Sequence, residues 1–194
     1  MTRKWFVRSM TIVMMIACSG CIFEPRTPEP PSGEDKYPWI VPNLPKTVFH
    51  NLSTGLASNT DSNYERSLDA TFTFHPTAQD SINLGPEKFA GWTKAVELDW
   101  LVRVKTLDVG ARTIQFGDAK GNFPYEDEEA QSATYEGPYK MVLVGAAQDT
   151  FAGIARFTLT RGTQGWMMTR WTDIEASESY ATSGYLRGTL RATR

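Results

Sequence analysis

Three side chains, His75, Asp99 and Asp173, are candidates for acid–base chemistry in this 194-residue chain. The two histidines are His50 and His75, and Asp99 and Asp173 each lie within two residues of a tryptophan. An imidazole has an unperturbed pKa of ~6.5, so His75, at the end of a predicted strand, would suit a general base. A histidine hydrogen-bonded at a strand end is the structural alternative, and capping or surface positions would explain the two acids.

No catalytic motif accompanies these residues. The sequence has no GxSxG nucleophile elbow, no GxGxxG or P-loop glycine pattern, and no HExxH zinc motif. We therefore expect a protein without catalytic activity. An enzyme using His75, Asp99 or Asp173 stays open as the alternative.

Metal and cofactor sites are not expected either. Both cysteines, Cys18 and Cys21, lie near the N-terminus, so the rest of the chain has no disulfide and no cysteine metal site. The acidic run 126–129 lacks the alternating oxygen ligands and the glycine of a calcium loop, which predicts a solvated loop. The net charge of −2 also argues against nucleic-acid binding, which needs a basic surface.

The N-terminus has the three parts of an export signal. A basic region with Arg3, Lys4 and Arg8 precedes the apolar stretch 10–17, which is far short of the ~20 residues of a membrane-spanning helix. Small residues, Ser19 and Gly20, then precede Cys21. This arrangement resembles a bacterial lipoprotein signal, which implies lipidation of Cys21. An ordinary signal cleaved near residue 17 or 20 is the alternative.

The sequence predicts three regions and a location. Residues 1–20 would be the lipoprotein signal peptide, and 21–36 a proline-rich tether to the membrane, with a proline-rich ligand for a partner as the alternative. Residues 37–194 would form a single α+β domain. Because Ile22, rather than an inner-membrane retention aspartate, follows Cys21, we expect the outer membrane of a bacterial cell envelope.

Helical patterns come first in the domain. Thr47 is a candidate cap for a helix with apolar residues at i, i+3 and i+7, and a short helix is expected from Asp61. An alternating strand follows at 70–74, and Pro86 is expected to begin a long helix. The apolar positions assigned to that long helix are Phe89, Trp92, Val96 and Trp100.

Strand patterns dominate the second half. Segments 113–116, 154–161 and 166–174 alternate, whereas 139–144 is apolar throughout and is expected to be covered on both faces. Helices followed by consecutive strands predict an α+β fold with a curved, mainly antiparallel sheet packed against the N-terminal helices.

The order of these elements is similar to the nuclear-transport-factor-2-like fold of SnoaL-like cyclases and ketosteroid isomerases. The resemblance covers 45–176 and rests on Phe72-Thr-Phe74-His-Pro and on a closing strand with Trp166 and Trp171-Thr-Asp173. It implies a cone-shaped domain, and family enzymes place an acid or histidine inside the cone. Lipocalin-like and cystatin-like arrangements are the alternatives.

The expected ligand-binding residues are Trp92, Trp100, Trp166 and Met168. In a regular closing strand, Trp166 and Trp171 point to opposite faces unless a bulge intervenes, and we assign Trp171 to the core. The predicted function is binding of a small apolar molecule or an envelope protein. A SnoaL-like isomerase, cyclase or hydrolase and a purely structural envelope protein stay open, and a homodimer is possible.

Overall fold

The computed structural model describes residues 37–58, 61–107, 109–145 and 148–191, which form an α+β domain. Its helices are α2 (Pro45–Ala57), α3 (Ser62–Ser67), α4 (Ala78–Leu84), the 3-10 turn η1 (Pro86–Lys88), α5 (Lys94–Thr106) and α6 (Ser183–Leu190). Its strands are β1 (Leu68–His75), β2 (Val109–Phe116), β3 (Tyr125–Glu128), β4 (Ser132–Gly145), β5 (Gln148–Gly162) and β6 (Gly165–Ala176). The predicted fold class is confirmed.

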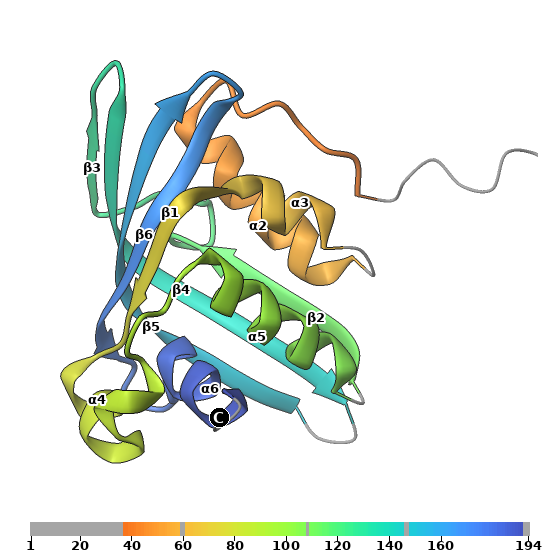
Figure 1. Ribbon diagram of the computed structural model, residues 1–194, viewed down its shortest axis with the longest axis vertical. Helices are drawn as coiled ribbons and strands as arrows, with labels where there is room; N and C mark the ends of the chain where they lie inside the picture. Colours follow the sequence, from red (N-terminus) through yellow and green to blue (C-terminus); the bar gives the residue numbers. More distant parts are fainter. Residues whose placement is uncertain (1–36, 59–60, 108, 146–147, 192–194) are drawn as a thin grey trace, which may run out of the picture. The chain divides into compact units, whose positions relative to one another are not determined.

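One mixed sheet organises the domain. Its strand order is β1-β6-β5-β4-β2, and β3 pairs with β4 beside β2. All pairings are antiparallel except β1 with β6, because β1 arrives from the helical part of the chain and not from a hairpin. Figure 1 shows the curved sheet with α2, α3, α5 and α6 all on one side.

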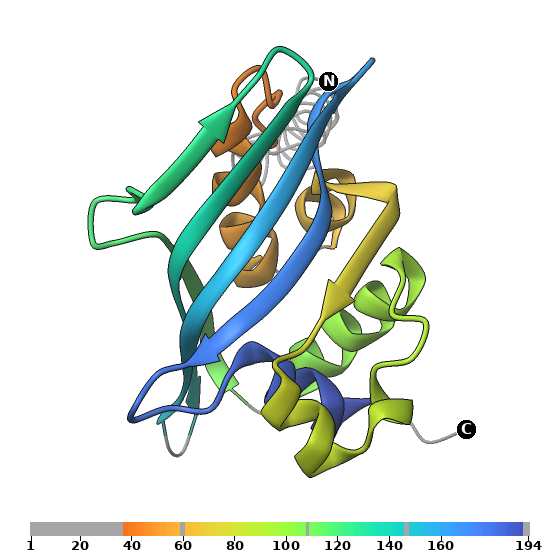
Figure 2. The same cartoon turned by 90° about the vertical axis from the view of Figure 1, so that its left-hand side faces the viewer.

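The other face of the sheet has no helix over it in the described part of the chain. Figure 2 shows the strands in front of the helices from that side. Along β4 buried and more exposed residues alternate, with Lys140 and Val144 exposed. The prediction that 139–144 is covered on both faces is therefore wrong. Antiparallel strands can face water on one side, even where apolar residues lie there.

The predicted start of the long helix at Pro86 is also wrong. Pro86 begins only η1, and α5 starts at Lys94, so Phe89 and Trp92 precede the helix. Gly91, with φ of 62°, turns the chain between the two elements. The buried positions of α5 are Glu97, Trp100, Leu101 and Val104, which have helical i, i+3, i+4, i+7 spacing.

Other boundaries differ less. The first helix, α2, begins at Pro45, two residues before the predicted cap Thr47, because proline suits the first helical position. The acidic run 126–129 was expected as a loop, but most of it lies in β3. That strand sits at the edge of the sheet and is exposed throughout, so no apolar alternation marks it. Helices α4 and α6 were not predicted.

A bulge in β6 decides which side chains enter the core. Thr158 pairs with Arg170 and Leu159 with Met168, which leaves Thr169 as an extra residue. The alternation shifts by one at this point, so Trp166, Met168 and Trp171 are all buried, with Trp171 1% exposed. Trp171 is confirmed as core. The bulge replaces the regular alternation that would place Trp166 and Trp171 on opposite faces, and both tryptophans are buried.

Candidate functional site

A buried ion pair lies inside the cone, between the sheet and the helices. Arg187 of α6 donates from Nη2 to Glu97 Oε1 at 2.7 Å and from Nε to Glu97 Oε2 at 3.0 Å. Both side chains are 0% exposed. Removing two charges from water has a large desolvation cost, and a bidentate arginine–carboxylate geometry of this kind offsets it. Burial alone would lower the pKa of Arg187, but the Glu97 carboxylate raises it.

Glu97 also accepts hydrogen bonds from two neutral side chains. Tyr64 Oη donates to Oε1 and Trp92 Nε1 donates to Oε2, each at 2.7 Å. Burial, and then the Glu97 charge, raise the pKa of Tyr64 well above its usual value, so its hydroxyl stays protonated as a donor. Each carboxylate oxygen of Glu97 therefore has two hydrogen-bonding partners.

Asp173 joins strand β6 to the start of α6. Its Oδ2 accepts hydrogen bonds from the Gly184 N–H at 2.9 Å and from Ser183 Oγ at 3.0 Å, and its Oδ1 accepts one from Trp171 Nε1 at 2.7 Å. A carboxylate here meets the unpaired N–H groups and the positive end of a helix. Burial raises the pKa of Asp173 to about 6, although the Arg187 charge opposes the shift.

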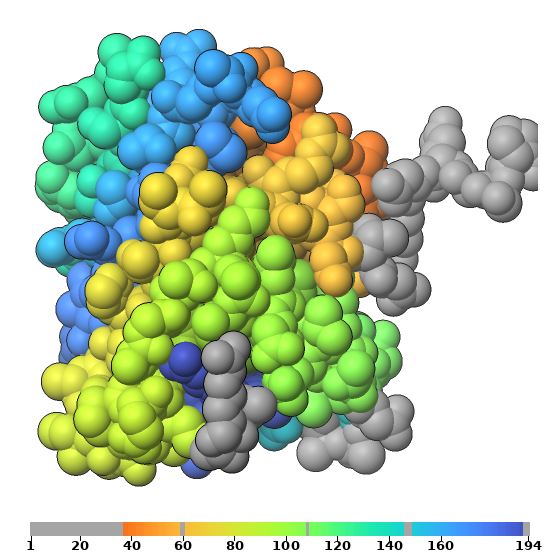
Figure 3. Space-filling model, in the orientation of Figure 1, coloured from red at the N-terminus to blue at the C-terminus, as the bar shows by residue number. Residues whose placement is uncertain are grey.

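A second aspartate fastens α6 to α4. Asp80 Oδ2 accepts hydrogen bonds from Thr182 Oγ1 at 2.5 Å and from Thr77 Oγ1 at 2.7 Å. Thr182 is the N-cap of α6 and also accepts from the Tyr185 N–H. In Figure 3, part of α6 shows as dark blue atoms between those of α4 and α5. The C-terminal helix is therefore held inside the domain by polar contacts at its first turn.

Of the two predicted acids, Asp173 is buried inside the domain and Asp99 is not. Asp99 faces solvent and pairs with Arg103 at 3.0 Å, whereas Glu97, two residues earlier on the same helix, points inward. Neither Glu97 nor Arg187 was singled out by the sequence analysis. A charged residue in the apolar stripe of α5 was the available signal for Glu97. It was missed because the predicted apolar stripe ran through Trp92 and Val96, which left Glu97 outside it.

His75 lies at the rim of an open pocket of about 390 Å³. Phe74, Phe89 and Trp92 contribute aromatic surface to it, so two of the predicted site residues, His75 and Trp92, come together here. Burial and then the charge of Arg170 lower the pKa of His75, which favours a neutral imidazole at pH 7. We refer to this as the His75 pocket.

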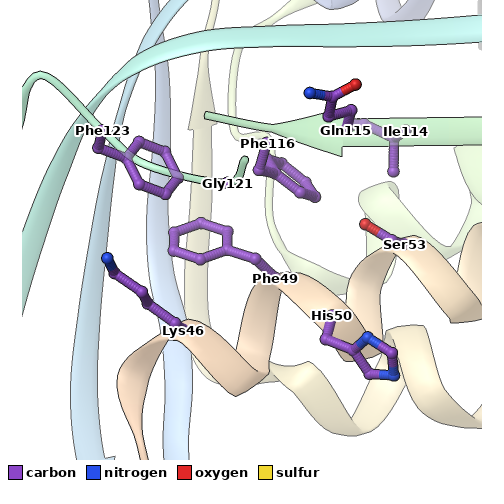
Figure 4. A pocket seen from close by; sticks show the side chains of 9 residues that line it. All are labelled: Lys46, Phe49, His50, Ser53, Ile114, Gln115, Phe116, Gly121 and Phe123. Atoms are coloured by element: carbon purple, nitrogen blue, oxygen red, sulfur yellow. The ribbon is translucent and has the colours of Figure 1, made fainter. Parts of the chain in front are cut away.

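A second pocket of about 290 Å³ opens between α2 and β2, and we call it the phenylalanine pocket. Its lining consists of Phe49, Ile114, Phe116 and Phe123, with Lys46, His50, Ser53, Gln115 and Gly121 around them. Figure 4 shows the Phe49 ring directed toward Phe116 and Phe123, whereas His50 points away from the rings. The Phe49 ring centroid lies 5.1 Å from that of Phe116 and 4.9 Å from that of Phe123.

The other predicted ligand residues are buried away from both pockets. Trp100, Trp166 and Met168 are each at most 4% exposed, and none of them lines either of these two pockets. Of that set, Trp92 lines one of these two pockets, the His75 pocket. Within the described ranges, no three or more His, Cys, Asp or Glu side chains are grouped to hold a metal ion.

The proposed lipidation site lies outside the described residues, because these begin at residue 37. None of the helices within the described ranges is long and apolar enough to cross a membrane.

Comparison with solved structures gives the fold a name. An NTF2-like superfamily protein from Salmonella enterica serovar Typhimurium has a TM-score of 0.50 at 10% identity, covering 69% of this chain and 89% of its own. A protein of unknown function from Mycobacterium tuberculosis has a TM-score of 0.51 at 8% identity, covering 74% and 81%. A conserved protein from Planctomyces limnophilus has a TM-score of 0.50 at 13% identity, covering 68% and 92%.

The domain therefore has an NTF2-like fold. No family model and no curated protein matches the sequence. At these identities the likeness concerns the fold alone, and function has to be argued from the site.

Proposed function

We propose that this protein is a lipid-anchored component of a bacterial cell envelope whose NTF2-like domain binds a small apolar molecule without catalysis. The phenylalanine pocket is the proposed binding site. The observation that carries the proposal is an open aromatic pocket beside a cone interior that is closed by the chain's own side chains.

The chemistry of the phenylalanine pocket favours an apolar ligand. Phe49, Phe116 and Phe123 are each 5–8% exposed, so their rings present only part of their surface. The nearby cation, Lys46, is paired with Glu126 at 2.7 Å and is therefore neutralised locally. A concave aromatic surface with few polar groups at the rim is typical of small-molecule sites.

The interior of the cone supports binding without catalysis. In NTF2-like enzymes an acid or histidine inside the cone would meet the substrate. Here two inward carboxylates are shielded from solvent. Glu97 is bonded to Arg187, Tyr64 and Trp92, and Asp173 accepts from Trp171 Nε1, Ser183 Oγ and the Gly184 N–H. A carboxylate held in this way has no free position from which to take a substrate proton.

Fluorescence titration with 1-anilinonaphthalene-8-sulfonate tests the proposed pocket. Ser53 lines the pocket from α2, so Ser53→Phe should fill part of it and weaken probe binding at least tenfold. Val102→Phe is the matched control, because Val102 is 47% exposed on α5 and lies outside the pocket lining. Equal probe binding by wild type and both variants would reject the phenylalanine pocket as the ligand site.

The lipid anchor is tested separately. In bacteria grown with an alkyne fatty acid, the wild-type protein should become labelled and sediment with membranes. The Cys21→Ala variant should lose the label. Two acyl chains anchor a protein stably, with each buried CH₂ contributing ~0.8 kcal/mol. Cys18→Ala is the control and should be labelled like wild type. Labelling of the Cys21→Ala protein would contradict the proposed anchor.

The lowered pKa of His75 favours one alternative, a SnoaL-like acid–base enzyme acting at the His75 pocket. A neutral imidazole beside Phe74, Phe89 and Trp92 could accept a proton from an apolar substrate. Turnover of an apolar ketone by wild type, with at least a hundredfold loss in His75→Ala, would support this enzyme and displace the non-catalytic proposal.

A further inference from the structure

The surroundings of Arg187 have the form of a cation-binding site. The centre of its guanidinium group lies 4.3 Å from the ring centroid of Phe74, 4.4 Å from that of Trp100 and 4.3 Å from that of Trp171. The Glu97 carboxylate closes the remaining side with its two-pronged contact. Aromatic faces and a carboxylate together form a cage for a planar cation. We call these four residues the guanidinium cage.

We infer that the guanidinium cage is a binding site for a monoalkylguanidinium ion, and that α6 is a tethered ligand supplying Arg187 to it. The cage residues come from β1, α5 and β6, so none of its four walls belongs to α6. The C-terminal helix supplies the occupant and one further contact, because Ser183 Oγ accepts a hydrogen bond from Arg187 Nη1 at 2.7 Å. This site is distinct from the phenylalanine pocket and does not depend on the function proposed there.

The cage selects a guanidinium over an ammonium ion. Two nitrogens of Arg187 reach the two different oxygens of Glu97, which a single ammonium nitrogen cannot do in the same geometry. The planar group also lies against three rings at nearly equal distances. Among the buried polar side-chain atoms of the described residues, Trp100 Nε1 has no hydrogen-bond partner.

Helix α6, which carries Arg187, is attached to the rest of the domain at both of its ends. Asp173 and Asp80 fasten its first turn, and Arg191, at its end, donates to the carbonyl oxygens of Lys88 and Ala90. A tether raises the effective concentration of the bound group, so an external cation competes poorly with Arg187 in the wild type. Removing the side chain should expose the site to an external ligand.

Chemical rescue of the full-length Arg187→Ala variant tests the inference. Methylguanidinium replaces the lost group, and its binding to the cage, which is formed in the folded protein, should raise the melting temperature. At tens of millimolar it should restore at least half of the melting temperature lost on substitution. Methylammonium at the same concentration should restore much less, and sodium chloride should restore none.

Three variants control for general salt effects. Arg187→Met fills the cage with an apolar chain, and Glu97→Gln combined with Arg187→Ala removes the carboxylate, so neither should respond to methylguanidinium. Arg191→Ala removes a guanidinium outside the cage and should not respond either. A response in Arg187→Ala alone supports the cage.

The inference fails if methylguanidinium does not stabilise Arg187→Ala, or if it stabilises the control variants equally. Should Arg187→Ala lack a cooperative melt by itself, methylguanidinium must restore one. Continued absence of a melt at saturating methylguanidinium, while Arg187→Met folds, would also reject the cage as a cation site.

Discussion

Glu97 and Arg187, 90 positions apart in the chain, form a fully buried ion pair that joins α5 to α6. The pair lies in the interior of the domain, between the sheet and the helices. Around it the cage rings, the Tyr64 hydroxyl and the Trp92 indole are all oriented toward the two charges. The C-terminal helix is therefore an integral part of the core of this domain.

Removing the charge of Glu97 should strongly destabilise the domain. Glu97→Gln leaves the buried Arg187 charge without a counter-ion, and such a change costs about 3–5 kcal/mol of unfolding free energy. Asp99→Asn is the matched control on the same helix. Asp99 is exposed and its pair with Arg103 should contribute below about 0.5 kcal/mol. Urea unfolding measures both, and similar losses would contradict the assigned burial.

Both closing-strand tryptophans should matter for stability. The Trp171 ring centroid lies 5.1 Å from that of Phe157 and 5.4 Å from that of Phe116, and Trp166 is only 4% exposed. Trp171→Ala and Trp166→Ala should each cost about 3–5 kcal/mol of unfolding free energy, as for other buried aromatics. Chemical denaturation tests this. A clearly smaller loss for Trp166→Ala would show that the bulge does not bury it in solution.

The buried carboxyl of Asp173 should make stability depend on pH. Its pKa in the folded domain is about 6, above the ~3.9 of an unfolded aspartate, so the folded state binds more protons between these values. The stability from this group is complete below pH ~4 and is lost as pH rises through about 6. Relative to Asp173→Asn, the wild type should therefore lose stability from pH 4 to 7. A constant difference across this range would contradict the raised pKa.

Helix α6 should be sensitive to side-chain size at Gly188. A Cβ atom there would lie 2.6 Å from Leu84 Cδ1 and 2.7 Å from Phe89 Cζ, closer than packed carbon atoms allow. We expect Gly188→Ala to cost about 1–3 kcal/mol despite the better helix propensity of alanine. Gly110→Ala is the control, because its nearest neighbour is 3.7 Å away. A stabilised Gly188→Ala variant in thermal melts would argue against the docked position of α6.

Local patterns in the sequence were enough to predict the fold class. The spacing of Phe49, Leu52 and Leu56 marked α2, and alternation marked most of the sheet, because helix and strand periodicities are properties of short segments. The aromatic ending with Trp171 and Asp173 also indicated the NTF2-like fold. Even the contact of Asp173 with a backbone N–H group was anticipated, although its partner Gly184 was not.

The buried Glu97–Arg187 site could not be predicted from the sequence, because it forms only in the tertiary structure. Helix α6 was not predicted because Gly184 and Gly188 lower its helix propensity, yet these glycines let the helix approach the core closely. The bulge at Thr169 is visible only in the pairing of two strands. The partnership of Glu97 with Arg187 likewise follows from the packing of α6 and not from spacing. Sequence periodicity reports which residues share a face of one element, but burial and charge pairing arise between elements, so only the assembled fold decides them.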